Sequence, residues 1–589
     1  MSVTPRRSFS KFTAADWLSE EILALAQRVG INREDLLVLG KIVRELAETT
    51  TENRATHLKI ESSDEIVFLK KAVSIPSLNK IVGTACDFSE GKVKPLVFDE
   101  ENSALYFFRH YGQELRTAEN FVARACVNAT FPISPLSERI IEAALPFPLN
   151  TDQKRAVRSV ISRPMTVISG GPGTGKTTLL LRALLCLFAE NPEIKIILAA
   201  PTGKAAGRMK EAIRVQAEQI RQSTDSAAAF PTDALQRAES LEVATLHRVL
   251  KVGASVLTMP DVPVLNADCV ITDESSMVDQ FIMHRLLSAL RSGARLVLIG
   301  DKNQLDSVGA GRVFGAICAA RGLSDSRVEL TESRRFDVRG LLGRLARGVV
   351  DGDVSSVSSV LDNDFSSEER DHEIYRFMPG EITSDVLNAA MMDVFPEKLR
   401  SVPVDADPEE MLSLLDSARV ITPLRRGKFG SDTLNAHACR LFASSGAPSS
   451  PHFHGRPVII TRNAPQERLF NGDTGIVLRD STGTFSAYFR GDDGEIRRIP
   501  AALLPEHETA YAMSIHKAQG SEFSRLCVIF PPEGAQPDFF SRQLLYTALT
   551  RFREDGKNSR FRLLFDRLSL LNAVARDNPM RELLFARKF

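Results

Sequence analysis

The chain has 589 residues, which is too long for a single hydrophobic core and predicts three or four domains. Its hydrophobic content of 43% and charged content of 25% are typical of a globular protein with a large buried interior. Basic and acidic residues both number 74, so the formal net charge is zero, which argues against a protein that coats nucleic acid indiscriminately.

Seven cysteines are spread along the chain, and no two form a Cys-x-x-Cys pair. An odd number without metal or disulfide spacing favours reduced thiols that behave as small apolar residues. Residues 1–17 contain basic side chains but lack the apolar segment of a secretion signal, and the most apolar stretch, 179–189, is too short to cross a bilayer. We therefore expect a cytoplasmic protein without a membrane segment.

Residues 1–140 differ in texture from the rest of the chain. Apolar residues recur at helical spacing within 17–29 and 36–46, which predicts two amphipathic helices. Two strand-like segments follow at 96–98 and 105–108. No cluster of side chains in this region suggests catalysis, so we predict a mainly helical domain that binds or braces.

Four continuous apolar segments mark residues 141–340 as an α/β domain; they are 165–169, 194–200, 268–272 and 295–299. Continuous apolarity, as opposed to alternation, indicates strands that are buried on both faces of a parallel sheet. Polar or glycine-rich residues follow each segment at once. Ligands of such sheets bind beyond the carboxyl ends of the strands, so these residues are the candidates for a site.

A second α/β domain is predicted for residues 419–589. Residues 341–418 are polar and acidic, and we expect them to connect the two sheets. The middle of the second series is rich in strand-like segments, and GDTG and GDDG turn signals interrupt it. This pattern predicts a small β-rich insertion at about 452–508.

The sequence GGPGTGKT at 170–177 matches the phosphate-binding loop pattern between a predicted strand and a predicted helix. Glycine allows backbone N–H groups to wrap phosphates, and the helix start adds its positive dipole end. Lys176 is expected to reach the β and γ phosphates, and the Thr177 hydroxyl to ligate Mg²⁺. The residues expected to bind ATP in this loop are Gly171, Pro172, Gly173, Thr174, Gly175, Lys176, Thr177 and Thr178.

Two adjacent acids, Asp273 and Glu274, end the predicted strand at 268–272. Nucleotide hydrolysis needs one carboxylate to hold Mg²⁺ and another to take a proton from the attacking water. We assign the metal to Asp273 and the water to Glu274. An acidic pair is more often a solvated loop, but its place at a buried strand end after a phosphate-binding loop favours the functional interpretation.

Three further side chains are candidates for sensing the terminal phosphate. Gln304 follows the predicted strand at 295–299, and Arg335 and Arg551 are candidate arginine fingers. An arginine aimed at a transferring phosphoryl group contributes ~10³–10⁵ in rate, so a second domain that supplies one can gate hydrolysis. Taken alone, each arginine is more often part of a surface ion pair. The functional interpretation rests on their occurrence together with the phosphate-binding loop and the acidic pair.

A series of motifs resembles superfamily-1 helicases of the branch that moves 5′→3′. They occur in the order GGPGTGKTT, APTGKAA, ATLHRVL, ITDESSMVD, LIGDKNQLDSVGAGRVF, LTESRRF, SIHKAQGSEF and LLYTALTR. Within that branch the chain is similar to the RecD family, the α subunits of exonuclease V, because PTGKAA, TLHRVL and DESSMVD are spelled as in that family. Residues 95–114 and 455–477 extend the likeness over nearly the whole chain.

The resemblance implies an α/β fold with two RecA-like parallel-sheet motor domains, a helical N-terminal domain and a small β-rich, SH3-like insertion. It implies that Gln153 reads the adenine and that Lys176 with Thr177 and Asp273 with Glu274 are the Walker pairs. Gln304, Arg335 and Arg551 match the coupling glutamine and the phosphate-facing arginines, with the choice between Arg334 and Arg335 left open. The residues implied to line the DNA path are Thr202, Lys204, Thr245, His247, His516, Lys517 and Gln519.

Two of these implications carry alternatives. His247 is as consistent with helix packing as with DNA contact. The family has a hairpin that separates strands, and it falls at 251–267, where the sequence is not obviously rich in turns.

The implied function is an ATP-dependent 5′→3′ translocase or helicase on single-stranded DNA, with Mg²⁺ as cofactor. The resemblance further implies action at duplex DNA ends in double-strand break repair and recombination, within a RecBCD helicase–nuclease whose RecB and RecC subunits dock on residues 1–140. A stand-alone RecD-like helicase is one alternative, although helix-hairpin-helix elements are not found in 1–140. An idle, ATP-binding structural subunit is another, which the complete array disfavours.

Two other site types are not expected from the sequence. The acid-rich stretches at 351–353 and 368–371 lack the Asp…Glu-x-Lys arrangement of a metal nuclease. The pair His452-x-His454 lacks companion ligands at metal spacing, so it is interpreted as a loop.

Overall fold

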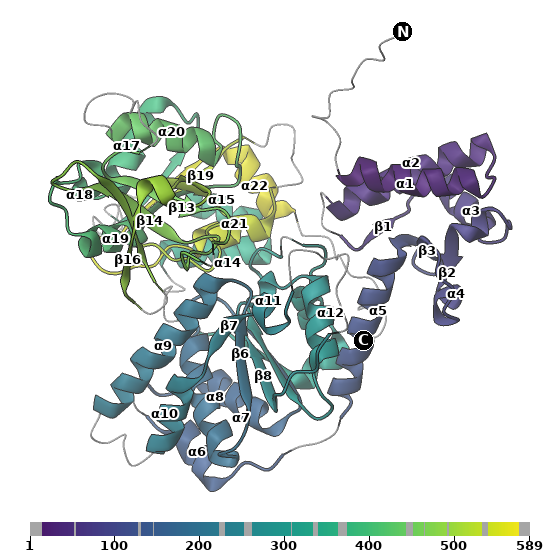
Figure 1. The fold of residues 1–589 in the computed structure, drawn as a ribbon, viewed down its shortest axis with the longest axis horizontal. Helices are drawn as coiled ribbons and strands as arrows, with labels where there is room; N and C mark the ends of the chain where they lie inside the picture. The colour runs from purple at the N-terminus through teal and green to yellow at the C-terminus, as the bar shows by residue number, and fades with distance from the viewer. Residues whose placement is uncertain are drawn as a thin grey trace.

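The chain is described by a computed structural model. The residues it describes are 14–51, 55–127, 131–144, 147–222, 230–252, 262–307, 309–333, 340–362, 374–442, 452–464, 466–491, 494–532 and 540–576. Within these ranges the chain forms an N-terminal unit, a first and a second lobe that each contain a parallel sheet, and an antiparallel insertion in the second lobe (Figure 1).

The N-terminal unit joins a helical pair to a four-stranded sheet. Helices α1 (Ala14–Arg28) and α2 (Arg33–Thr51) are the two that helical spacing predicts, and their buried faces share a core with the sheet. The two predicted strands are present as β3 (Leu96–Asp99) and β4 (Ala104–Phe107). The sheet order is β1-β4-β3-β2, completed by β1 (His57–Lys59) and β2 (Val82–Thr84), with α3 (Ser63–Ala72) and α4 (Ala85–Ser89) alongside.

Helix α5 (Phe108–Ala125) belongs to both the N-terminal unit and the first lobe. Tyr111, near its start, packs against the N-terminal sheet, whereas Phe121 is fully buried in the core of the first lobe. Thr117 accepts a 2.8 Å hydrogen bond from Gln280 of α12 (Gln280–Ala289). Helix α6 (Pro135–Glu142) also packs into the first lobe. The N-terminal unit therefore ends inside α5, and the sequence-based boundary at residue 140 was placed too late, because α5 runs unbroken between the two cores.

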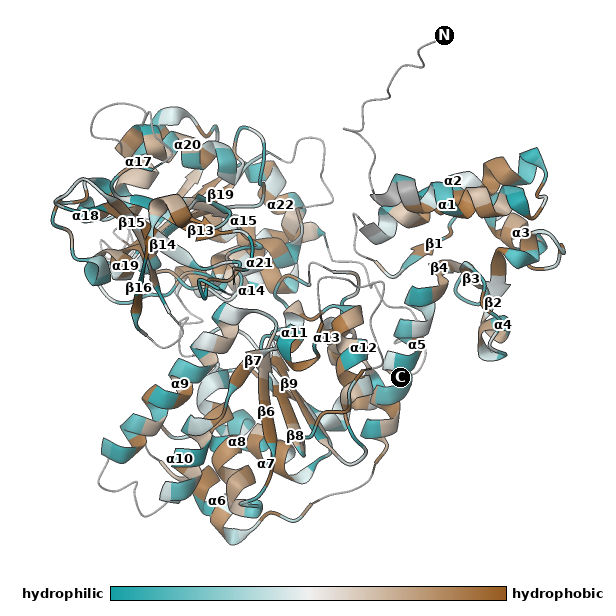
Figure 2. Cartoon of the chain, in the orientation of Figure 1, coloured by the Kyte–Doolittle hydropathy of each residue, from teal (hydrophilic) through white to brown (hydrophobic). Residues whose placement is uncertain are grey.

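The first lobe is a six-stranded parallel sheet in the order β10-β5-β9-β8-β6-β7. Its four central strands match the four predicted apolar segments; they are β5 (Met165–Gly170), β6 (Ile196–Ala200), β8 (Cys269–Thr272) and β9 (Arg295–Gly300). Figure 2 shows β6, β8 and β9 as brown, hydrophobic ribbons. The edge strands β7 (Val243–Thr245) and β10 (Arg327–Leu330) were not predicted, since they are short and less apolar.

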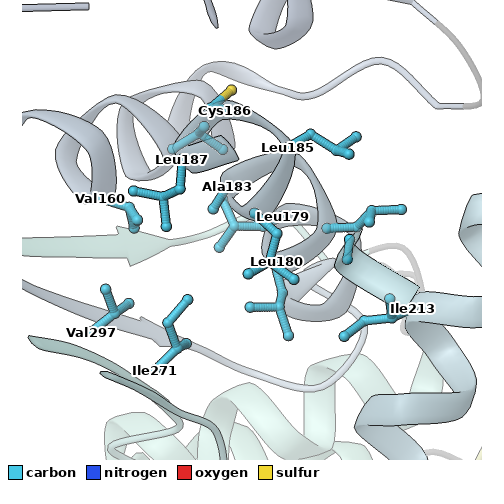
Figure 3. Packing of buried hydrophobic residues seen from close by; sticks show 14 of the residues in the cluster. Val160, Leu179, Leu180, Ala183, Leu185, Cys186, Leu187, Ile213, Ile271 and Val297 are labelled. Carbon is cyan, nitrogen blue, oxygen red and sulfur yellow. The ribbon is translucent and has the colours of Figure 1, made fainter. Parts of the chain in front are cut away.

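Helix α8 (Lys176–Glu190) anchors the phosphate-binding loop to the core of the first lobe. Figure 3 shows its leucines together with Ile271 and Val297 of the sheet and Val160 and Ile213 of α7 (Thr151–Ser162) and α9 (Gly203–Gln222). Burying a leucine side chain stabilises a fold by ~1.5–3 kcal/mol, so this helix is firmly held and its first turn is fixed in space. Helix α10 (Thr232–Ser240) completes this layer.

The opposite face of the first sheet is covered by α11 (Leu246–Val249), α12 and α13 (Val313–Ala319). With α5 packed outside them, both faces of the sheet are buried. This double covering agrees with the continuous apolarity of the strands.

The second lobe is a five-stranded parallel sheet in the order β11-β20-β19-β12-β18. Its strands are β11 (Tyr375–Pro379), β12 (Ala418–Thr422), β18 (Ala512–Ser514), β19 (Arg525–Phe530) and β20 (Arg560–Phe565). Helices α21 (Arg542–Leu549) and α22 (Arg567–Ala575) pack on one face of it.

Residues 341–418 are part of the second lobe, and their interpretation as a connecting segment was wrong. Helix α14 (Leu341–Asp351) has an apolar stripe through Leu345 and Val349 that is fully buried in the core of this lobe. Strand β11 adds an edge to the sheet. The remaining helices of the segment are α15 (Val354–Asp362), α17 (Ser384–Val394), α18 (Glu397–Arg400) and α19 (Pro408–Ser417). The polar composition reflects their outer faces.

The β-rich insertion is a five-stranded antiparallel sheet in the order β16-β15-β14-β13-β17. Its strands are β13 (Arg456–Ile460), β14 (Thr474–Arg479), β15 (Phe485–Arg490), β16 (Ile496–Pro500) and β17 (His507–Thr509). Val458, Val477 and Phe489 form a small core of their own. Helix α20 (Ser431–Phe442) precedes it. Two parallel-sheet lobes, a mainly helical N-terminal unit and a β-rich insertion confirm the predicted fold class.

The sequence also led to expectations about a pin hairpin and about membrane segments. Most of the candidate pin hairpin at 251–267 lies outside the described residues, because 253–261 are not among them. None of the described helices combines the length and the apolarity that crossing a bilayer requires.

The contact between α5 and α12 predicts a pH-dependent stability. The pKa of His284 on α12 is lowered to about 4, mainly by burial and to a smaller extent by the cations of Arg116, Arg285 and Arg109. In the unfolded chain the histidine pKa is ~6.5, so between pH ~6.5 and about pH 4 the unfolded chain binds more protons than the folded chain. The free energy of unfolding should therefore decrease as the pH falls through this window.

We expect His284→Gln to lose part of this acid sensitivity, so that its melting temperature drops less than that of the wild type between pH 7.5 and pH 5. His110 on α5, whose pKa burial also lowers to about 4, should keep a smaller slope in the variant. Thermal unfolding at both pH values measures the difference. Equal slopes in the two proteins would contradict this assignment.

Candidate nucleotide and DNA site

The phosphate-binding loop runs from the end of β5 at Gly170 to the start of α8 at Lys176. Gly173 and Gly175 have φ of 74° and 78°, in the left-handed region that favours glycine. A Cβ at Gly175 would also lie 2.4 Å from Nε2 of Gln153. The loop therefore requires glycine at this position, and its backbone N–H groups gather at a helix start, where anions bind.

Lys176 turns back over the loop in this structure. Its Nζ donates to the carbonyl oxygens of Gly170 at 2.6 Å and Gly171 at 3.3 Å. Thr174 closes the same turn through a 2.8 Å bond from its hydroxyl to the Gly171 oxygen. Thr177 and Thr178 follow in the first turn of α8. The ammonium group is thus already positioned beside the space that the loop encloses.

Gln153 braces the phosphate-binding loop from α7. Its Oε1 accepts the N–H of Asn150 at 3.0 Å, which caps the helix, and its Nε2 donates to the Thr174 carbonyl at 2.8 Å. The side chain is buried, with 4% exposure. Its contact with an adenine stays a prediction.

The acidic pair follows β8, on the same edge of the sheet as the loop. The Glu274 N–H donates to Oδ1 of Asp273 at 2.8 Å, and Glu274 has a φ of 50°, a strained value for a residue other than glycine. Burial and, to a smaller extent, the Glu274 carboxylate raise the pKa of Asp273 against the opposing effect of Lys176, and the net pKa is about 6. Lys176 and the acids thus share one electrostatic site.

A third acid at this edge, Asp301, was missed from the sequence. It follows β9 as Asp273 follows β8, and it is 1% exposed. Its carboxylate accepts the N–H of Asn303 at 3.0 Å and the side-chain amide of Gln304 at 3.3 Å. Burial raises its pKa, and Lys176 lowers it. The sequence does contain a signal for Asp301, because a ligand group is expected directly after an apolar strand.

The second lobe closes over this edge. The hydroxyl of Tyr546 on α21 donates to Oδ2 of Asp301 at 3.1 Å, and a Cβ on Gly171 would lie 3.0 Å from the same hydroxyl. The N–H of Leu305 donates to Oγ1 of Thr547 at 2.7 Å. Helix α21 therefore lies against both the phosphate-binding loop and the segment that carries Gln304.

Of the two candidate arginine fingers, the structure describes Arg551 but not Arg335. Arg551 is 3% exposed and donates to the Thr547 carbonyl at 3.1 Å and the Ser521 carbonyl at 3.2 Å, both in its own lobe. Arg335, like Arg334, lies outside the described residues. The chain that leads to them touches the loop, since Ser333 donates to the Pro172 carbonyl at 2.7 Å. Both finger assignments stay predictions.

Three of the predicted DNA contacts line one hollow. Thr202, His247 and Gln519 surround a cavity of about 190 Å³. The other lining residues are Pro201, Leu246, Met277, Val278, Asp279, Ile282, Ser307 and Gly309. Gln519 comes from the second lobe and donates to the Leu305 carbonyl at 2.9 Å, so both lobes contribute to this hollow.

The other predicted DNA contacts are placed differently. Thr245 caps α11 by accepting the N–H of Arg248 at 3.3 Å. Lys204 on α9 faces the second lobe; burial lowers its pKa to about 8, Asp416 raises it, and Arg419 lowers it. Lys517 donates to Glu508 of β17 at 2.7 Å, and His516 lies in the turn after β18. The structure does not bring these four residues into the hollow.

His452 and His454 lie in a loop that precedes β13. His454 engages the Pro403 carbonyl at 2.8 Å and accepts the N–H of Arg479 at 2.9 Å. In the part of the chain that the structure describes, no three His, Cys, Asp or Glu side chains are grouped as ligands of a metal ion.

The sequence of the chain is similar to those of several known proteins. A family model described as an AAA domain matches residues 148–367, and one described as a UvrD-like helicase C-terminal domain matches residues 509–554. The RecBCD enzyme subunit RecD of Mycobacterium tuberculosis is 35% identical over 442 residues, which cover 73% of this chain and 72% of that protein. The RecBCD enzyme subunit RecD of Haemophilus influenzae is 28% identical over 521 residues, covering 79% and 77%.

Two more distant similarities were found. The ATP-dependent RecD2 DNA helicase of Deinococcus radiodurans is 28% identical over 410 residues, or 69% of this chain and 48% of that protein. The crystal structure of Bacteroides Pif1 bound to single-stranded DNA matches 71% of this chain and 92% of that chain, with 16% identity and a TM-score of 0.37.

The shape of the loop gives a test of nucleotide binding. We expect Gly175→Ala to weaken the binding of a fluorescent ATP analogue about tenfold or more, because the left-handed backbone costs an alanine ~1–2 kcal/mol and the new Cβ displaces Gln153. Gly203→Ala is the matched control, since a Cβ at that position would meet no atom within 4 Å. Equal affinity in both variants would show that the loop does not hold the nucleotide.

Proposed function

The chain belongs to the RecD family of DNA helicases, and from this premise we propose that it uses ATP and Mg²⁺ to move 5′→3′ along single-stranded DNA as the RecD-type subunit of a RecBCD helicase–nuclease. The observation that carries the proposal is the contact of α21 with both the phosphate-binding loop and Asp301. A nucleotide in the loop would therefore lie between the two lobes.

The residues at this edge fit a magnesium nucleotide. Lys176 and the N–H groups of the loop would hold the phosphates, and Thr177 with Asp273 would hold Mg²⁺, which commonly takes one or two protein ligands plus phosphate and water. ATP supplies the phosphoanhydride bond whose hydrolysis drives movement. Glu274, directly beside Asp273, would take a proton from a water molecule. Gln304 would report on the terminal phosphate through its bond to Asp301.

Residues of the second lobe would complete the site when the lobes close. Arg551 lies one helical turn beyond Thr547, which already bonds to the first lobe. Closure that frees its guanidinium from the Thr547 and Ser521 carbonyls would let it stabilise charge on a phosphoryl group. Arg335 is proposed for the same role, from a chain segment that contacts Pro172.

Gln519 supports the coupling of hydrolysis to movement. It lines the hollow with Thr202 and His247, and it also bonds to Leu305, next to Gln304. A shift between the lobes at the nucleotide is therefore transmitted to the hollow. We propose that each hydrolysis cycle shifts the two DNA-binding surfaces past each other by about one nucleotide. Such a step is energetically feasible, because opening a duplex costs ~1.4 kcal/mol of stacking per base-pair step.

The chemistry of the hollow suits a motor that is indifferent to sequence. Thr202, His247 and Gln519 offer short polar side chains for the sugar-phosphate backbone, and α9 begins directly after Thr202. Apolar walls from Leu246 and Met277 offer a surface for a base. We also propose DNA contact for Thr245, Lys204, His516 and Lys517; Lys204 and Lys517 would first have to leave their present neighbours.

RecB and RecC are the proposed partners, and duplex DNA ends the proposed substrate. The support is that the RecD relatives are named as subunits of the RecBCD enzyme and are matched over most of their length, whereas RecD2 is matched over 48%. The N-terminal unit is the proposed docking domain. It exposes large apolar side chains, with Leu37 at 69%, Val67 at 50% and Val93 at 79%.

A DNA-stimulated ATPase assay tests the proposal. We expect the wild type to hydrolyse ATP slowly alone and much faster with single-stranded DNA, and Lys176→Gln to lose about 10³-fold or more of this rate, because it removes the cation that faces the phosphates. Lys195→Gln, an exposed lysine of the same lobe, is the matched control. Turnover that is insensitive to DNA, or full activity in Lys176→Gln, would refute the motor function.

Direction and assembly need separate measurements. Displacement of streptavidin from the 3′ end of an oligonucleotide, but not from the 5′ end, is expected for 5′→3′ movement. Copurification of the full chain with RecB and RecC of the same source tests the assembly. Movement toward the 5′ end, or a chain that stays alone, would sink the corresponding part of the proposal.

A further inference from the structure

The loop of residues 519–523 in the second lobe is held from both lobes. On the first-lobe side, Gln519 bonds to Leu305, and Arg208 of α9 donates to the Gly520 carbonyl at 2.5 Å. On the second-lobe side, the Ser521 carbonyl accepts from Arg551. Phe523 is bonded to the backbone of residues 551–553: its N–H donates to the Arg551 carbonyl at 2.8 Å, and its carbonyl accepts the N–H of Arg553 at 2.8 Å. The 519–523 loop is thus one connection between the first lobe and Arg551, beside the one through Thr547.

Arg208 is the charged group that the first lobe contributes to this connection. Besides the Gly520 carbonyl, its guanidinium contacts Oε1 of Glu522 at 2.6 Å. Two nitrogens of one planar group therefore hold two different acceptors of the loop. A lysine, with a single charged nitrogen, does not reproduce this geometry.

Arg208 also feels the acidic pair at the end of β8. Burial lowers its pKa, but the carboxylates of Glu522, Glu274 and Asp273 raise the pKa above its usual value. In return, Arg208 lowers the pKa of Asp273. The Asp273 N–H also donates to the Ala199 carbonyl at 3.0 Å, four residues before α9 begins, so the helix that carries Arg208 is joined to the acidic pair through the backbone as well as by charge.

We propose that Arg208 is a positioning residue for ATP hydrolysis, which links the state of Asp273 and Glu274 to the placement of Arg551 through the 519–523 loop. This inference rests on the proposed motor function. When Mg²⁺ and phosphate change the charge beside the acids, the attraction between Arg208 and those acids changes. The loop, which Arg208 holds at Gly520 and Glu522, then moves with α9, and the bonds at Ser521 and Phe523 carry Arg551 with it.

The same helix supplies a matched control for Arg208. Arg214, six residues further along α9, pairs with Glu211 at 2.7 Å within its own helix, and both side chains are exposed. Removing its charge changes no contact between the lobes. A comparison of Arg208→Ala with Arg214→Ala therefore separates the connection from a general effect of charge on α9.

The test measures kcat and KM of the DNA-stimulated ATPase, together with the Kd for a fluorescent ATP analogue, in the full-length chain. Arg208→Ala is expected to lower kcat about tenfold or more, because both charge-assisted hydrogen bonds to the loop are lost, while the Kd stays within about twofold. Arg208→Lys should recover little of the rate, because the forked geometry is lost. Arg214→Ala should behave as the wild type.

A second variant tests the pathway. Glu522→Gln should lower kcat in the same way, and the double variant Arg208→Ala/Glu522→Gln should be no slower than the worse single variant, because both changes break one connection. Thermal melting checks that each variant is folded. Should Arg208→Ala be unfolded, Arg208→Lys and Glu522→Gln still decide the question.

Three outcomes would overturn the inference: an unchanged kcat in Arg208→Ala, a raised Kd and KM with unchanged kcat, or additive losses in the double variant. The raised Kd would assign Arg208 to nucleotide binding instead. Failure of the motor function is distinguishable, since it appears as a wild type without DNA-stimulated hydrolysis.

Discussion

The rest of the structure depends on one constraint: the two lobes must meet at the end of a buried sheet. The hydrogen bond from Tyr546 to Asp301 is where they meet. Asp301 is a buried acid, and such a group needs hydrogen-bond donors. Its donors come from both lobes, the Gln304 amide from the first and the Tyr546 hydroxyl from the second. This contact between the two lobes, the seam, is therefore polar and directional, and a small shift between the lobes changes the environment of the acids.

Polarity at the seam contrasts with the interiors of the lobes. Each parallel sheet is covered on both faces by apolar helices, as α8 covers the first sheet, and such interiors resist deformation. In the proposed motor the lobes would therefore move as rigid bodies, and the change of shape would be confined to hydrogen bonds at the edge where the strands end. Side chains that join bodies, such as Gln519 and Thr547, are consequently the ones that can transmit a movement.

The central strands could be predicted from the sequence because a strand buried on both faces carries a continuous run of apolar residues, as β9 does from Leu296 to Ile299. Strands of three to five residues at sheet edges, such as β7 and β11, carry no such signal. The segment at 341–418 was misassigned because its polar composition concealed the buried stripe of α14, which spacing reveals and composition does not.

Prediction of the site followed the same division. Local pattern located the loop at 171–176 and the acids at 273–274, because each sits directly after an apolar strand. The pairing of Lys517 with Glu508, and of Arg551 with Ser521, depends on contacts between distant segments and is not encoded locally. The end of the N-terminal unit was misjudged for a related reason, since a helix shared by two cores looks like any amphipathic helix.

That shared helix, α5, has a mechanical consequence. It crosses from the N-terminal sheet to α12, whose capping residue Asp279 is a wall of the hollow that Thr202 and His247 line. An α-helix of 18 residues is stiff over its whole length, ~27 Å. It would therefore act as a lever arm that pivots near Phe121. A torque applied to its amino-terminal end would reach the hollow where we propose that DNA binds, and a load at the hollow would reach the far end.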